Sequence, residues 1–191
     1  MSSRTDKDRL IRRILRVDHA GEHGAISIYT AQIKHLRRAD LETSAWLSET
    51  LAHEISHRQK FKDAMPSRTA KPCRALGIWT VGGKVLGSVT AFWGQSAVMA
   101  CTVAVERTVH GHLLDQISFL RKHDAELAGI VEAILEEELG HLSHAETALG
   151  SGKLISLLIG PVIVVATEAM IAISTRGDAL RLKRDLAQFT G

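Results

Sequence analysis

The segment Gln32-Ile33-Lys34-His35-Leu36-Arg37-Arg38-Ala39-Asp40-Leu41-Glu42 decides the fold, because a related segment follows 84 residues later. The second copy reads Gln116-Ile117-Ser118-Phe119-Leu120-Arg121-Lys122-His123-Asp124-Ala125-Glu126, and six of the eleven positions are identical. Each copy lies between two long stretches with apolar residues at helical spacing. The chain therefore contains two related helical hairpins, over about residues 9–65 and 93–149. Two such hairpins form a four-helix bundle.

The same periodicity predicts helices over about residues 9–38, 41–64, 95–122 and 124–149. The segment Pro66–Pro72 is a clear break. Apolar accessory segments of about 66–92 and 153–191 are added to the bundle. We expect a short helix over 76–93, lying on the end of the bundle or in a membrane interface, and a tail interrupted at Gly160-Pro161. No strand pattern stands out, so the sequence predicts an all-α fold and a single domain over residues 1–191.

Composition excludes several classes of protein. With 45% hydrophobic residues in 191, the chain can bury a core and is not disordered. Cys73 and Cys101 are too few for a disulfide scaffold and fit no metal-binding spacing. The net charge of +3 comes from Lys and Arg spread along the chain, without aromatic RNA-binding or zinc-finger motifs. We therefore expect no nucleic-acid partner.

The 84-residue offset also aligns acidic residues and histidines. Each half has one glutamate on its first helix and a Glu-x-x-His sequence on its second helix. These six candidate ligands are Glu22, Glu54, His57, Glu106, Glu138 and His141. Residues at i and i+3 share a helix face, so each Glu-x-x-His directs two side chains to one place.

These residues could instead be surface charges on amphipathic helices, but their surroundings argue against that. Glu22 lies among small residues, and Glu106 follows the nearly apolar run 98–105. A glutamate in such a run is expected to be buried and needs a partner. Four carboxylates and two neutral imidazoles balance two divalent cations, which is the ligand set of ferritin-like dinuclear proteins. Carboxylate-rich ligation favours iron, or manganese, over zinc.

One competing motif overlaps the first Glu-x-x-His. His53 and His57 flank Glu54 in a His-Glu-x-x-His sequence, which is typical of zinc proteases. In the second half the residue equivalent to His53 is Glu137, while Glu138 and His141 are retained. The shared pattern is thus Glu-x-x-His, and His53 is interpreted as an accidental addition.

The apolar composition of the two accessory segments predicts contact with a membrane. Val85–Val105 is uncharged over 21 residues but leads directly into Glu106, so we expect a break near Gly94 rather than a membrane span. The uncharged stretch Leu154–Thr167, of 14 residues, is too short to span. Aromatic residues beside basic residues near positions 71–93 are typical of an interfacial helix. The alternative is that both segments only cap the core. Two apolar accessories favour an oily substrate reached from the membrane.

Four motifs resemble the demethoxyubiquinone hydroxylase family of ubiquinone biosynthesis. They are Val17-Asp18-His19-Ala20-Gly21-Glu22, the Glu-x-x-His at 54–57, Met99–Glu106 and the Glu-Glu-Leu-x-His at 137–141. The resemblance covers about residues 9–149. It implies a ferritin-like fold and two iron ions on the six candidate ligands. It also implies hydroxylation of the ring of a polyprenylated methoxy-benzoquinone by a monooxygenase that uses O2 and NADH.

The resemblance further implies a peripheral protein of the inner cell or mitochondrial membrane, on its cytoplasmic or matrix side. Other proteins of ubiquinone biosynthesis are possible partners, and a homo-oligomer is possible. A related di-iron hydroxylase with another substrate, or a ferroxidase, stays open as an alternative function.

Residues near the ligands complete the prediction. Asp18, His112 and Asp115 are candidates for hydrogen bonds to the ligands, and so is His19. Tyr29, seven residues after Glu22, is expected to line the pocket or to pack in the core. Two features depart from the family pattern. Leu113 stands where the family often has a tyrosine, and the tail over 166–171 differs.

Overall fold

The computed structural model describes residues 4–36, 40–150 and 153–174, together with Leu182, Arg184 and Leu186. In order the helices are α1 (Arg4–Leu36), α2 (Leu41–Ala64), α3 (Leu76–Phe92), α4 (Gln95–His123), α5 (Ala125–Leu149) and α6 (Lys153–Ser174), with a 3-10 turn over Pro66–Arg68. No strand occurs in this part of the chain. The predicted all-α, ferritin-like class is confirmed. The first helix begins earlier than predicted, and its predicted end falls outside the described residues.

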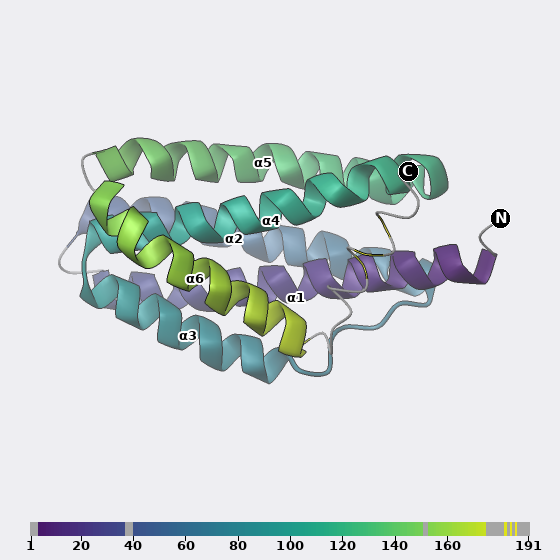
Figure 1. The fold of residues 1–191 in the computed structure, drawn as a ribbon, viewed down its shortest axis with the longest axis horizontal. Helices are drawn as coiled ribbons and strands as arrows, with labels where there is room; N and C mark the ends of the chain where they lie inside the picture. Colours follow the sequence, from purple (N-terminus) through teal and green to yellow (C-terminus); the bar gives the residue numbers. More distant parts are fainter. Residues whose placement is uncertain are drawn as a thin grey trace.

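Helices α1, α2, α4 and α5 form the bundle, in which α1 packs against α2 and α4 against α5 (Figure 1). The second helix of each hairpin starts at an aspartate that caps it. Asp40 accepts a hydrogen bond from the backbone N–H of Thr43 (3.0 Å), and Asp124 accepts one from that of Leu127 (3.1 Å). Such caps satisfy amide groups at a helix start that have no partner within the helix. The aspartate of each repeated segment therefore begins the second helix of its hairpin.

Three buried apolar clusters fill the bundle and flank a polar layer. In α1, one cluster takes residues between positions 10 and 20, and another takes residues between 25 and 36. In α5, buried apolar residues occupy positions 127–134 and 145–149. The predicted glutamates and histidines lie between these apolar stretches. The core therefore holds the polar layer away from water at both ends.

Helix α3 packs along the side of α1 (Figure 1), so the predicted place on the end of the bundle is wrong. Glycines explain the close approach. A Cβ on Gly83 would lie 2.7 Å from Cβ of Ser27, and a Cβ on Gly87 would clash with the carbonyl oxygen of Ile28. On α1, Gly24 leaves the space that the ring of Trp79 fills. The small residues thus allow the backbones of α3 and α1 to pack closely.

The turn at Gly94 separates α3 from α4, which confirms the predicted break. Gly94 has a φ of 86°, a conformation that residues with a Cβ rarely adopt. The uncharged stretch over 85–105 is therefore two helices rather than one. No helix in the described part of the chain is long and apolar enough to cross a membrane.

Helix α6 continues through Pro161, so the predicted interruption at Gly160-Pro161 is wrong. A proline inside a helix removes a backbone hydrogen bond. Packing offsets that loss, because Ile159 and Ile163 contact the apolar cluster around Tyr29 and Val98. Most of the predicted accessory segment beyond residue 174 lies outside the described residues.

Candidate metal centre

All four bundle helices contribute to one buried cluster. Glu22 comes from α1 and Glu106 from α4, and the two Glu-x-x-His pairs come from α2 and α5. Each of the six residues is at most 5% exposed. Their ligand atoms form two overlapping groups of four, in each of which all atoms lie within 4.8 Å of one another. The groups are Glu22, Glu54, His57 and Glu138, and Glu54, Glu106, Glu138 and His141. The structure thus brings all six candidate ligands together.

Glu138 occupies the middle of the cluster. Its Oε1 lies 3.1 Å from Nδ1 of His57, and its Oε2 lies 3.1 Å from Nδ1 of His141. Nδ1 of His141 is also 3.5 Å from Oε1 of Glu54. Both histidines therefore turn Nδ1 toward the carboxylates. Glu54 and Glu138 belong to both groups and would contribute to both of two metal positions, whereas Glu22 and Glu106 each belong to one group only.

The carboxylates cannot all carry charge in this environment without cations. Burial, followed by the charge of Glu138, raises the pKa of Glu22 to about 7. The same two causes raise the pKa of Glu54 and of Glu106 well above the ordinary value. Burial also opposes ionisation of Glu138, but hydrogen bonds with His141 and His57 outweigh it and lower its pKa. The protein alone therefore stabilises only part of the negative charge that this cluster can carry.

The donor set fits two divalent metal ions. Oε1 of Glu54 is buried and has no hydrogen-bond partner in the described part of the chain. A buried carboxylate oxygen without a partner costs free energy that a cation would offset. Four carboxylates with two imidazoles also match the charge and geometry of dinuclear carboxylate sites. Metal binding by these residues stays a prediction.

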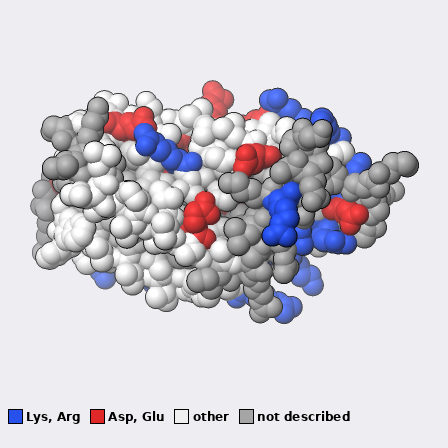
Figure 2. All heavy atoms as spheres, viewed as in Figure 1, with Lys and Arg blue, Asp and Glu red and all other residues white. Residues whose placement is uncertain are grey.

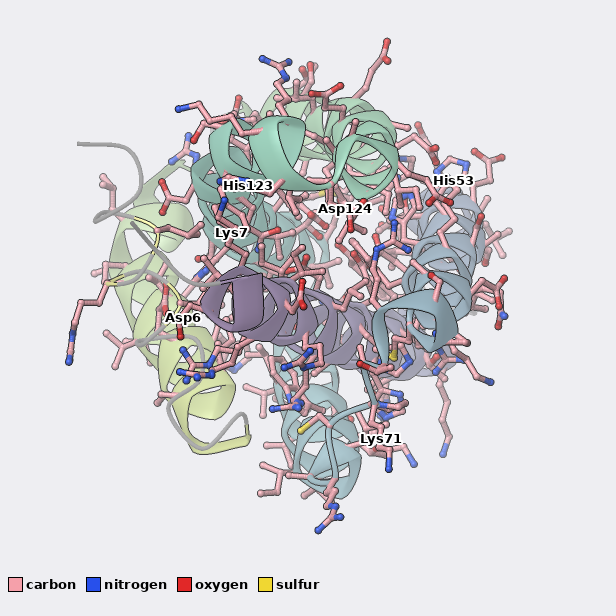
Figure 3. All side chains as sticks on the ribbon, turned by 90° about the vertical axis from the view of Figure 1, so that its right-hand side faces the viewer. Asp6, Lys7, His53, Lys71, His123 and Asp124 are labelled. Atoms are coloured by element: carbon pink, nitrogen blue, oxygen red, sulfur yellow. The ribbon has the colours of Figure 1, made fainter. Side chains whose placement is uncertain are left out.

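Each histidine has a partner on its outer side, and the sequence did not reveal either contact. Nε2 of His57 lies 3.0 Å from Oε2 of Glu137, whose other oxygen accepts a hydrogen bond from Lys60 (3.1 Å). Nε2 of His141 lies 3.0 Å from Nδ1 of His53, and the two rings stack with centroids 5.2 Å apart. The 84-residue offset pairs positions 53 and 137 and could have pointed to both. Figure 3 labels His53 on α2.

The position of His53 argues against a zinc protease site. His53 is exposed and belongs to neither group of candidate ligands. It contacts the outer nitrogen of His141 and does not share a metal position with His57 and Glu54. His53 instead stacks on His141, a candidate ligand of the other hairpin.

Tyr29 lies against the cluster from α1. Its hydroxyl donates a hydrogen bond to Oε1 of Glu106, and the side chain is also part of an apolar cluster. Tyr29 therefore packs in the core and contacts a candidate ligand, but it does not line the cavity that reaches Glu22. Burial, with the neighbouring Glu106 and Glu54, raises the pKa of Tyr29 well above 10. The phenol is thus a neutral hydrogen-bond donor at physiological pH.

A small cavity of about 30 Å³ reaches Glu22 between α1, α4 and α6. Its walls are formed by Val17, Asp18, Gly21, Val109, His112, Leu113 and Ile171. His112 lies 3.1 Å from Glu168 of α6, measured from Nε2 to Oε1, at this cavity. The cavity is mostly apolar and connects the ligand layer with α6.

The other predicted neighbours of the ligands, Asp18, His19 and Asp115, lie in different surroundings. Asp18 accepts a hydrogen bond from Gln116 (2.8 Å) and lines the cavity, and burial raises its pKa to about 8. His19 is buried, which lowers its pKa to about 4. The structure does not bring Asp115 to the cluster, because this residue is exposed on α4.

Comparison with known proteins places the chain in a family. The family model described as "Ubiquinone biosynthesis protein COQ7" matches residues 9–174. The 3-demethoxyubiquinol 3-hydroxylase of Rhodospirillum rubrum is 39% identical over 132 residues, which are 69% of this chain and 62% of that relative. The mitochondrial NADPH-dependent 3-demethoxyubiquinone 3-hydroxylase of Mus musculus is 37% identical over 133 residues, 68% of this chain and 60% of the relative.

A more distant relative is the mitochondrial 5-demethoxyubiquinone hydroxylase of Saccharomyces cerevisiae, 29% identical over 149 residues, which are 72% of this chain and 64% of that protein. The chain spans about three fifths of the length of the curated relatives it matches. Because the family model covers most of the chain, including all six candidate ligands, this chain belongs to the ubiquinone biosynthesis protein COQ7 family.

Proposed function

We propose that this chain is a di-iron monooxygenase that hydroxylates the ring of a polyprenylated methoxy-benzoquinone in ubiquinone biosynthesis. The observation that carries the proposal is the buried cluster of four glutamates and two histidines, in a chain whose relatives are named demethoxyubiquinone or demethoxyubiquinol hydroxylases. Iron held by these residues would supply the redox chemistry that activates O2. NADH is the proposed source of electrons, and NADPH is the competing one because relatives are named NADPH-dependent.

The cavity beside Glu22 is the proposed place of the quinone ring. Val109, Leu113 and Ile171 would pack on the ring and keep bulk water from the ligand layer. The cavity is small, at about 30 Å³. The ring can therefore reach Glu22 only if side chains such as Leu113 or Ile171 move aside.

The outer helices support binding to a membrane surface. Large apolar side chains are exposed on both accessory helices, and they form what we call the apolar face. Its main residues are Val81, Val85 and Phe92 on α3 and Leu157, Val162 and Val165 on α6. Figure 2 shows that much of the left part of this view lacks charged atoms, whereas Lys and Arg atoms gather toward the right. We propose that this face rests on the inner cell or mitochondrial membrane, from which a prenylated quinone enters the cavity.

The proposal is tested by metal analysis and a reaction. The purified full chain is loaded with Fe²⁺ and mixed with a short-chain demethoxyubiquinone, O2 and either NADH or NADPH, and the product is identified by mass. We expect two irons per chain and a hydroxylated quinone, both lost in Glu138→Ala. Glu136→Ala, an exposed neighbour on the same helix, is the matched control and keeps both. Oxidation of Fe²⁺ without quinone hydroxylation would instead indicate a ferroxidase, and zinc retained by Glu138→Ala would overturn the di-iron site.

A further inference from the structure

The two candidate metal positions have different surroundings, although the repeat makes their ligands equivalent. His57 has the carboxylate of Glu137 behind it, and His141 has the imidazole of His53 behind it, each at 3.0 Å. Residues 53 and 137 correspond under the 84-residue offset. Each contacts the histidine of the opposite hairpin. At this equivalent position the first half therefore has an imidazole and the second half a carboxylate.

The orientation of the rings makes this difference matter for a bound metal. Nδ1 of each histidine faces the glutamates, so Nδ1 is the atom that would bind metal. Nε2 must then carry the proton and donate it outward, from His57 to Glu137 and from His141 to His53. A hydrogen bond to a carboxylate is stronger than one to a neutral imidazole and increases the basicity of the ligand. Lys60 holds Glu137 in place (3.1 Å).

Glu22 and Glu106 each belong to only one group of candidate ligands. Their surroundings also favour tighter metal binding at the position of Glu22 and His57. Tyr29 donates a hydrogen bond to Glu106, which reduces the negative charge that this oxygen can offer a metal. At the equivalent position of the other half, Leu113 lines the cavity beside Glu22 and has no hydrogen-bond donor on its side chain. Glu22 therefore keeps a stronger donor oxygen than Glu106.

We propose that the two metal positions are inequivalent, and that the position of Glu22 and His57 binds the first divalent ion more tightly than that of Glu106 and His141. Glu137, His53 and Tyr29 act as positioning residues that create this difference. The inference rests on the proposed dinuclear centre. It adds an order of loading to a site whose six ligands alone would be nearly symmetric.

The test is a titration of the metal-free full chain with Co²⁺, followed by calorimetry and visible absorption. We expect two binding steps in the wild type. Glu137→Gln should weaken the tighter step about 10- to 100-fold and leave the weaker step in place. His53→Glu should tighten the weaker step about tenfold and leave the tighter one in place.

Controls separate a specific contact from a change of overall charge. Glu136→Gln and Ala52→Glu make the same charge changes at exposed neighbouring positions on α5 and α2. If they shift the two steps as much as the test variants do, or if Glu137→Gln weakens only the looser step, the proposed order of loading is overturned while the dinuclear centre stands. If wild-type protein binds no Co²⁺, the proposed function fails together with the inference.

Discussion

Tyr29 and Leu113 occupy equivalent positions of the two hairpins, 84 residues apart, and each is 1% exposed. Each also faces the glutamate of the opposite half. Tyr29 donates a hydrogen bond to Glu106, whereas Leu113 lines the cavity that reaches Glu22. The repeat therefore builds a symmetric frame, in which single substitutions give one glutamate a hydrogen-bond donor and the other an apolar wall.

Tyr29 is the only tyrosine in the chain, so its ionisation can be followed directly. Burial raises its pKa well above 10, and Glu106 adds to the shift. In the unfolded chain the phenol ionises near pH 10, so stability is lost as the pH rises above that value. We expect no tyrosinate absorbance from native protein at pH 10. At higher pH the absorbance should appear only when the helical circular dichroism is lost.

Tyr29→Phe is the control for that titration. It removes the absorbance change, and its stability should fall less steeply above pH 10 because no phenol ionises on unfolding. Tyrosinate absorbance that rises near pH 10 while the helices stay intact would show that Tyr29 is not held as a buried donor to Glu106.

Metal-free protein should be more stable at pH 4.5 than at pH 7 as far as Glu22, Glu54 and Glu106 are concerned. The folded-state pKa of Glu22 is about 7, against 4.5 for an ordinary glutamate, and those of Glu54 and Glu106 are raised as well. A raised carboxyl pKa favours the folded state below the unfolded value, and this contribution is lost as the pH rises through the folded value.

Metal loading should reverse the trend, because metal binds the deprotonated carboxylates. Thermal unfolding midpoints of metal-free and Fe²⁺- or Co²⁺-loaded protein across this pH range measure both slopes. In Glu22→Gln, the metal-free slope should become smaller. A metal-free midpoint that rises between pH 4.5 and 7 by the same amount in wild type and Glu22→Gln would contradict the assigned burial of these carboxylates.

The bundle and the six clustered residues could be predicted from the sequence because both depend on a repeat that is visible along the chain. The contacts between the hairpins could not. Whether His53 is accidental depends on how α2 packs against α5, and only the folded chain shows that its ring stacks on His141. The place of α3 depends likewise on Gly83 and Gly87 fitting against α1. Pro161 suggested a break because the helix preference of proline is a local property. It does not include the packing of α6 against neighbouring helices, which the sequence does not show.

Replacement of Gly87 by alanine should loosen α3 from α1. The added Cβ would clash with the backbone of Ile28, which cannot move without shifting α1. We expect a loss of roughly 1–3 kcal/mol in the free energy of unfolding, as for other overpacked positions. Gly77→Ala is the matched control on the same helix, because nothing lies within 4 Å of its added Cβ. Urea denaturation of both variants measures the difference, and equal stability of the two would show that α1 and α3 are less closely packed.

The ion pair of Arg68 with Asp124, which joins the 3-10 turn after α2 to the start of α5, should stabilise the folded chain in a pH-dependent way. Nε and Nη2 of Arg68 donate to the two carboxylate oxygens at 2.6 and 2.8 Å. This contact lowers the pKa of Asp124, so its stabilisation is present above the ordinary value of 3.8 and is lost as the pH falls below it. Asp124→Asn keeps a helix cap but loses the ion pair, and we expect a cost of about 1 kcal/mol at neutral pH that shrinks below pH 3.8.

Asp40→Asn is the matched control for that ion pair, because Asp40 caps α2 at the equivalent position. No ion pair of Asp40 with a described residue is found, so its replacement should cost less at neutral pH. Urea denaturation of both variants at several pH values gives the comparison. A cost of Asp124→Asn that stays constant down to acidic pH would mean that the ion pair contributes nothing.

A charge on the apolar face should weaken binding to membranes. Val85 on α3 is 60% exposed, and a valine that inserts into a lipid interface contributes about 1–2 kcal/mol. Val85→Glu should therefore reduce binding to vesicles of phosphatidylcholine and cardiolipin about tenfold in a sedimentation assay. Ile55→Glu adds the same charge at a 47% exposed position on α2, outside this face, and should bind as wild type does. If both variants lose binding equally, charge repulsion rather than insertion explains the effect. If neither does, α3 does not face the membrane.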